Sequence, residues 1–150
     1  ISSEKIIRTG FEQTQGQGST LLHVRRGDYL NIGEELSNKF YKEALLRATQ
    51  EINNFHYSIF TDDYNWVLSN PNFKGAKTIY HSSNSKQDTL ETFSQMLGFE
   101  NFIVGNSTFS LVAALLSKSN NKKIFVADPW FRNTGLSLNF KNAIKIKNLK

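Results

Sequence analysis

The chain has 150 residues, of which 39% are hydrophobic, carries a formal net charge of +5 and contains no cysteine. This size and hydrophobic content fit one domain with a packed core, and the lack of cysteine excludes disulfides, thiolate metal ligands and a cysteine nucleophile. The longest apolar run, residues 109–117, is too short to cross a bilayer, and the first residues lack the order of a signal peptide. We therefore expect a cytoplasmic protein, or one bound peripherally to the cytoplasmic face of a membrane.

The positive charge alone says little about partners. Arg132 and four lysines after it account for five of the eighteen basic residues, and the common interpretation of such residues is a solvated surface or tail. No face with clustered basic and aromatic residues is evident, so we expect no nucleic-acid partner.

The order of elements predicts the fold class. Residues 1–19 end in a Gly-, Gln- and Ser-rich stretch and indicate a linker or the remnant of a preceding domain, followed by one domain over residues 20–150. From residue 20 on, apolar stretches alternate with segments of helical spacing, which predicts a Rossmann-like parallel α/β sheet with helices on both faces. The predicted strands are residues 20–24, 56–61, 76–81, 101–105 and 122–127, and the predicted helices are residues 37–52, 64–70, 88–99 and 107–118. Ser37 or Asn38 can cap the first helix, and Asp88 the third.

Polar residues follow each predicted strand, where a parallel sheet of this kind binds its ligands. The successive groups are Arg25, Arg26 and Asp28; Asp62 and Asp63; residues 81–85; residues 106–108; and residues 128–130. Because the carboxyl ends of parallel strands share one edge of the sheet, we expect these groups to gather there.

The adjacent arginines Arg25 and Arg26 allow two interpretations. They can form surface ion pairs with the neighbouring carboxylates, or they can clamp a diphosphate. In the second case, the helix that starts at Ser107 and Thr108 adds hydroxyl donors and the positive end of its dipole. The sequence has no Walker motif and no G-x-G-x-x-G, so a phosphate would depend on arginines and hydroxyls instead of a glycine-rich loop.

Three other signals are weaker. Residues 26–28 spell RGD, but so short a motif often occurs by chance. Residues 61–63 offer clustered oxygens without the further carboxylates of a metal site, so a helix cap or an arginine partner is the preferred interpretation. The histidines lack metal-ligand spacing, and of them we expect only His23 near the site.

Several motifs in order indicate a family. HVRRGDYL resembles the HxRRxD motif of the fucosyltransferase superfamily, and in particular that of glycosyltransferase family 11, the α-1,2-fucosyltransferases. YSIFTDD resembles the family's strand ending in FSDD, residues 88–110 resemble the segment that runs into NSSFS, and KKIFVADPWF is similar to its closing strand with Pro-Trp. The resemblance covers residues 21–131.

This resemblance implies the donor-binding half of a GT-B-type enzyme that is inverting and metal-independent and needs no cofactor. The donor would be GDP-fucose and the acceptor a glycan hydroxyl, that of a galactoside. Carried over by position, Arg25 would hold the β-phosphate, Arg26 would act near the fucose or the phosphate, and His23 and Asp28 would order the loop and the nucleotide. The remaining nucleotide-sugar-binding residues would be Asp62, Asp63, Asp88, Asn106, Ser107, Thr108 and Ser110, with Glu91 as the alternative to Asp88 for reading guanine.

The resemblance also implies a preceding domain, because members of the family are longer and bind the acceptor through an N-terminal domain. The alternative to an active enzyme is therefore a GDP-sugar-binding module without activity of its own. The general base stays open at this point: Glu34 or Glu35 could approach the site, the other domain could supply the base, or no strong base is needed.

Overall fold

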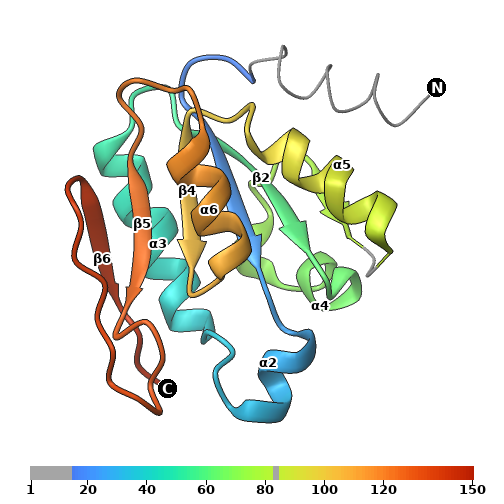
Figure 1. The fold of residues 1–150 in the computed structure, drawn as a ribbon, viewed down its shortest axis with the longest axis vertical. Helices are drawn as coiled ribbons and strands as arrows, with labels where there is room; N and C mark the ends of the chain where they lie inside the picture. The colour runs from blue at the N-terminus through green and yellow to red at the C-terminus, as the bar shows by residue number, and fades with distance from the viewer. Residues whose placement is uncertain (1–14, 83–84) are drawn as a thin grey trace.

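A computed structural model describes residues 15–82 and 85–150, so most of the predicted linker, and residues 83–84 after the third strand, lie outside the described residues (Figure 1). Six strands form one sheet in the part of the chain that is described. They are β1 (Ser19–Val24), β2 (His56–Thr61), β3 (Ile79–His81), β4 (Asn101–Gly105), β5 (Ile124–Asp128) and β6 (Ala143–Lys147). The helices are α2 (Gly27–Ile32), α3 (Asn38–Glu51), α4 (Tyr64–Leu68), the 3-10 helix η1 (Pro71–Phe73), α5 (Lys86–Met96) and α6 (Thr108–Leu116).

The strand order confirms a Rossmann-like fold. The sheet runs β3-β2-β1-β4-β5-β6, and each neighbouring pair is parallel. This is the order of doubly wound dinucleotide-binding sheets, in which the chain winds outward from β1 in one direction and then from β4 in the other. The point of reversal lies between β1 and β4.

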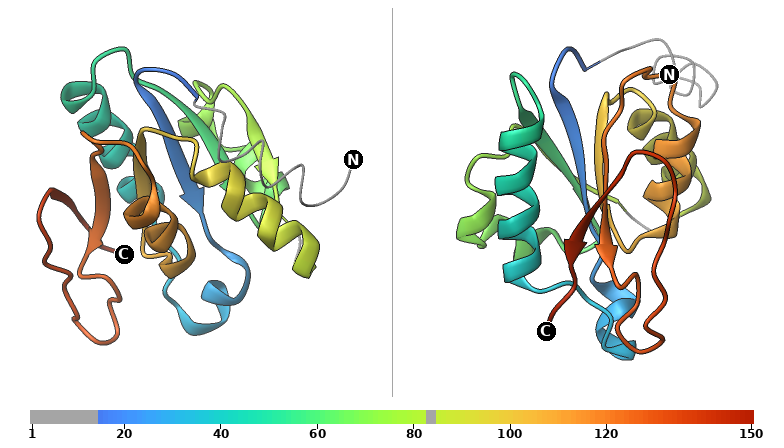
Figure 2. Two further views of the ribbon diagram at one scale, coloured as in Figure 1. Left: turned by 45° about the horizontal axis from the view of Figure 1, so that its top comes forward. Right: turned by 90° about the vertical axis from the view of Figure 1, so that its left-hand side faces the viewer.

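Helices cover both faces of the sheet, as predicted. Figure 2 shows α3 on one side and α5 and α6 on the other. On the α3 side, Phe40, Ala44 and Ala48 pack with strand residues such as Leu22 and Ile59, and α4 and η1 join the same cluster. The opposite cluster contains Met96 of α5 and Ala113 and Ala114 of α6, packed on Leu21 and Phe102. All six residues of β1 are buried because this central strand is covered on both faces.

The C-terminal segment is not the solvated tail expected from its lysines. β6 pairs in parallel with β5 along its length, and Ile144 and Ile146 join the α3-side cluster while Lys145 and Lys147 stay exposed. Lysines are common on edge strands because they discourage pairing with another chain. The alternation in AIKIK is therefore that of an edge strand buried on one face.

Two local features also differ from the prediction. α5 begins at Lys86 and is capped by Ser85, whose hydroxyl accepts a hydrogen bond from the Asp88 backbone N–H at 3.1 Å, so Asp88 lies in the first turn and is not the cap. The short helix α2, directly after the two arginines, was not predicted. Ser37 caps α3, one of the two expected choices.

No helix in the described ranges is both long and apolar enough to cross a membrane.

Candidate functional site

The candidate site lies at the carboxyl edge of the sheet, where β1 and β4 end side by side. Arg25 and Arg26 follow β1 and lead into α2, which extends beyond this edge at the bottom of Figure 1. Asn106 and Ser107 follow β4 and lead into α6. The two segments are in contact, because the Tyr29 hydroxyl donates to the Asn106 carbonyl at 3.1 Å. Doubly wound sheets bind ligands in the crevice at this reversal point.

Arg25 is the more exposed arginine and is shared between two carboxylates. Its Nη2 lies 3.1 Å from Asp28 Oδ1, and its Nε lies 3.3 Å from Asp62 Oδ2. The guanidinium also lies over the ring of Tyr29, with its carbon 5.5 Å from the ring centroid. About a third of the Arg25 side chain is exposed, so its guanidinium can be reached from solvent.

Arg26 is held more tightly and points to a different neighbour. Its guanidinium carbon lies 3.8 Å from the centroid of the Trp66 ring, and its Nε lies 3.2 Å from Asp63 Oδ2. Asp63 is also the N-cap of α4, since its Oδ1 accepts from the Trp66 backbone N–H. One carboxylate and one indole thus fix the plane of this guanidinium.

Asp62 orders the loop that carries the arginines. Its two carboxylate oxygens accept from the backbone N–H groups of Arg26 at 2.8 Å and Gly27 at 3.0 Å. A Cβ added at Gly27 would lie 2.7 Å from Asp62 Oδ2. A side chain at position 27, the glycine of the RGD tripeptide, would therefore force this carboxylate to move.

The two interpretations of the arginines are compatible. The structure brings Arg25, Arg26, Asp28, Asp62 and Asp63 together, and the arginines do pair with carboxylates, as the first interpretation expects. The two ion pairs of Arg25 lie near the surface, and ion pairs of that kind contribute little net stability, about 0–1 kcal/mol. A phosphate could therefore exchange with the carboxylates on Arg25 at small cost.

His23 lies directly beneath this loop. It is buried at the α6 side of β1, its ring contacts that of Phe109, and its Nδ1 has no hydrogen-bond partner among the described residues. Burial, with a smaller contribution from the nearby Arg25 charge, lowers the pKa of His23 to about 3. The imidazole is therefore neutral at physiological pH and adds no charge to the site.

At the start of α6, most of the predicted polar groups already serve the fold. The Asn106 side chain is buried and donates to the Glu34 carbonyl at 2.8 Å. Ser107 caps α6 by accepting from the Ser110 N–H, and the Ser110 hydroxyl donates back to the Ser107 carbonyl. Thr108 is exposed. Its hydroxyl is thus the most accessible of this group, together with the positive end of the helix dipole.

The two candidates for reading guanine lie farther along the same edge. Asp88 and Glu91 are on α5, which follows β3 at the outer end of the sheet. Asp88 is half-buried in the first turn, and Glu91 accepts from the Gln87 side chain at 2.9 Å. The choice between these two acids stays a prediction.

Arg132 was expected on a solvated surface, and this expectation is wrong. Its guanidinium donates to the carbonyls of Gly33 at 2.6 Å and Glu35 at 3.0 Å and to Asn148 Oδ1 at 2.8 Å. Its backbone N–H donates to the buried carboxylate of Glu34 at 2.9 Å. Arg132 therefore fastens the segment after α2 to the β5–β6 connection. No sequence pattern predicts this role for a single arginine between two strands. The stacking of Trp66 on Arg26 likewise has no signal in the sequence.

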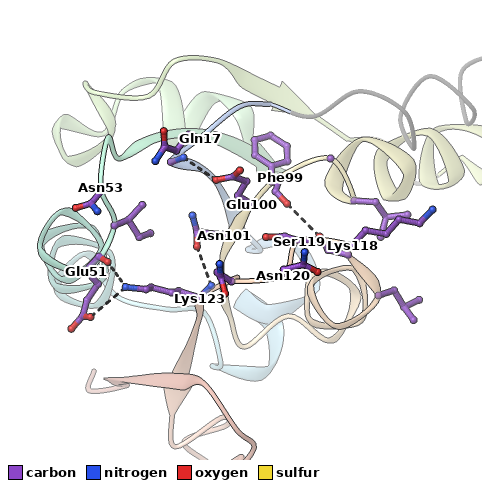
Figure 3. Close-up of a pocket in the computed structure, with 17 residues that line it drawn as sticks. Gln17, Glu51, Asn53, Phe99, Glu100, Asn101, Lys118, Ser119, Asn120 and Lys123 are labelled. Atoms are coloured by element: carbon purple, nitrogen blue, oxygen red, sulfur yellow. Dashed lines mark hydrogen bonds and ion pairs between the residues drawn. The ribbon is translucent and has the colours of Figure 1, made fainter.

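A cavity of about 820 Å³ lies at the opposite edge of the sheet, where the strands begin (Figure 3). Several of its polar groups already have partners within the fold. Glu51 pairs with Lys123, Glu100 accepts from the Gly18 N–H, and Asn101 accepts from the Lys123 N–H. In a doubly wound fold the strand beginnings do not form the ligand crevice, so we place the candidate site at the carboxyl edge.

Fold and site together define a class of protein. A doubly wound sheet with two arginines and a helix N-terminus at its reversal point suits an anionic ligand such as a nucleotide. The family model of glycosyl transferase family 11 matches residues 5–148. The chain therefore belongs to this family of fucosyltransferases, which use a nucleotide-sugar donor and a glycan acceptor. The match confirms the resemblance found in the sequence motifs. Searches among curated proteins and among solved structures gave no match.

Proposed function

We propose that this chain binds GDP-fucose at the carboxyl edge of its sheet and provides the donor side of an inverting, metal-independent transfer of L-fucose to a galactoside hydroxyl. One observation carries the proposal: Arg25, the more exposed arginine, lies at the β1/β4 reversal point beside the N-terminus of α6. Both groups favour a diphosphate, the arginine by its fork of donors and the helix by its dipole.

In the proposed reaction the acceptor oxygen attacks the anomeric carbon of fucose from the face opposite GDP. The bond between that carbon and the β-phosphate oxygen breaks, and its electron pair leaves with GDP. The proton of the acceptor hydroxyl passes to a general base on the acceptor-binding domain or, where the oxocarbenium character of the fucose makes a strong base unnecessary, to water. Arg25 neutralises the charge that grows on the β-phosphate, and Arg26 assists beside the fucose. A preorganised donor of this kind contributes about 10²–10³ in rate.

The carboxylates have supporting roles in this proposal. Asp28 and Asp62 hold Arg25 before the donor arrives and release it to the phosphate, while Asp62 keeps the backbone of the loop in place. His23, neutral and buried, supports the loop from below. Asp88, or Glu91 in its place, reads the guanine from the first turns of α5.

The proposal is tested by calorimetric titration of the chain with GDP-fucose, GDP-mannose and UDP-galactose without divalent metal. We expect binding of both GDP-sugars, GDP-fucose more tightly, and weak or no binding of UDP-galactose. Equal affinity for all three ligands, or binding only after Mg²⁺ is added, would contradict it. A repeat at high salt should weaken binding, because phosphate contacts to exposed arginines are screened.

A further inference from the structure

A small cavity of about 240 Å³ lies next to Arg26 at the start of α3, and we call it the Glu35 cavity. It is smaller than the clefts that hold drug-sized ligands, and it has room for a single small ring. Its lining includes Arg26, Glu35, Ser37, Trp66, Arg132 and Lys150.

Glu35 lines this cavity and has an acceptor oxygen that is not in use. Its Oε2 is buried and has no hydrogen-bond partner among the described residues, and a buried acceptor left unpaired is costly. The neighbouring Glu34 is different, since its two oxygens accept from the backbone N–H groups of Arg132 at 2.9 Å and Asn133 at 3.4 Å. The structure thus distinguishes Glu34, whose two oxygens accept hydrogen bonds, from Glu35, which has an oxygen without a partner. The sequence alone does not distinguish these adjacent acids.

The nearby arginines are already engaged elsewhere. The Arg26 guanidinium is stacked on Trp66 and bound to Asp63, and the Arg132 guanidinium donates to two carbonyls and to Asn148. The unpaired Glu35 oxygen is therefore available to accept a hydrogen bond from a ligand.

The charges around the cavity select the kind of donor. Arg26, Arg132 and Lys150 would attract a phosphate, but a phosphate dianion has no hydrogen to donate to the unpaired Glu35 oxygen. An amine would donate to Glu35 but would be repelled by the three cations. A neutral hydroxyl group avoids both costs, because it donates a hydrogen bond to a carboxylate without bringing a charge of its own. A ring that carries several hydroxyls, such as a monosaccharide, fits this mixed lining.

We propose that the Glu35 cavity is the subsite for the fucosyl group of the donor, with Glu35 accepting a hydrogen bond from one of its hydroxyls. This inference rests on the proposed function, which places the β-phosphate on Arg25. Arg26 is the next residue and borders the cavity, so a sugar attached to that phosphate lies within reach of it.

The test compares the Kd of GDP with that of GDP-fucose for the wild-type chain, Glu35→Ala and Glu35→Gln, by calorimetry without metal. We expect Glu35→Ala to weaken GDP-fucose binding ~10-fold or more, since a hydrogen bond to a charged group is lost, and to leave GDP binding unchanged. Glu35→Gln should lie between, because its amide oxygen still accepts. Glu43→Ala removes an exposed carboxylate of α3 outside this cavity and should change neither Kd.

An equal change in both Kd values for Glu35→Ala, or no change in either, would overturn the subsite while leaving the proposed function in place. Failure of the wild-type chain to bind GDP or GDP-fucose would overturn the proposed function and the subsite with it. Melting curves of each variant show whether it is folded, and Glu35→Gln, which keeps the size of the side chain, serves if Glu35→Ala does not fold.

Discussion

At the scale of single residues, the two adjacent arginines differ in how firmly they are held. Arg25 shares two carboxylates near the surface, whereas Arg26 is stacked on Trp66 and only 14% of its side chain is exposed. A ligand can therefore recruit Arg25 by exchanging ion pairs, while Arg26 offers a fixed guanidinium at the rim of the Glu35 cavity.

Arg25→Lys should weaken GDP binding ~10-fold, because a lysine cannot present the two parallel donors of a guanidinium to a phosphate. Arg26→Lys should lower turnover more than GDP affinity, since Arg26 borders the sugar and not the phosphate in the proposed site. Calorimetry with GDP measures the first effect. If Arg25→Lys binds GDP as well as the wild-type chain does, the arginines serve only as surface ion pairs.

His23 should make the stability of the fold depend on pH. Its pKa is about 3 in the folded chain and near 6.5 when unfolded, so the unfolded state binds the extra proton below pH 6.5. Stability is then complete above pH 6.5 and falls as the pH drops toward 3, by up to ~1.4 kcal/mol per pH unit. Urea unfolding between pH 7 and 5, where few carboxylates titrate, measures this slope.

The matched variant for this measurement is His23→Asn, because the asparagine side chain at position 23 does not titrate. Its stability should be lower overall because the site is buried, but nearly flat between pH 7 and 5. An equal slope in the variant and the wild-type chain would show that another group is responsible.

At the scale of elements, the loops beyond the carboxyl edge are held together by a few hydrogen bonds instead of a large apolar contact. α2 buries none of its residues, and the segment that follows it is fastened by Arg132. Arg132→Ala should cost ~2–4 kcal/mol of unfolding free energy, since two partly buried carbonyls and the buried Asn148 lose a charged donor. Lys141→Ala, at an exposed position on the same connection, should stay within about 0.5 kcal/mol. Chemical denaturation of both variants checks this, and equal stabilities would contradict the role of Arg132.

The elements that the sequence predicted well are those with a periodic apolar pattern. β1, β2, β4, β5 and α3 lie close to their predicted places because their core residues repeat with the spacing of a strand or a helix. α2 was missed because it has no apolar face to bury. β6 was missed because its alternation has only two isoleucines, Ile144 partly buried and Ile146 buried, among exposed lysines. The sequence predicts Asp88 as the cap of α5, whereas the structure has Ser85 in that position. Both residue types are good caps, so residue type alone does not decide between them.

At the scale of the whole molecule, the strand order decides where the site lies. The alternation of elements predicts that polar residues gather at the carboxyl edge, and the structure brings five of the predicted charged residues together there. Which strands are neighbours depends on pairings far apart in the sequence, so the reversal point between β1 and β4 could not be predicted. The contacts of Trp66 and Arg132 depend on the same long-range packing.

The central claim is that a GDP-sugar binds at this reversal point and not in the larger cavity at the other edge. The most direct measurement is a two-dimensional ¹H–¹⁵N NMR titration of the labelled chain with GDP-fucose. We predict the largest amide shifts at residues 25–29 and 106–110, with small shifts at residues 97–101 and 117–121 around the other cavity. Shifts concentrated at the strand beginnings, with the segment after β1 unchanged, would contradict this assignment of the donor site.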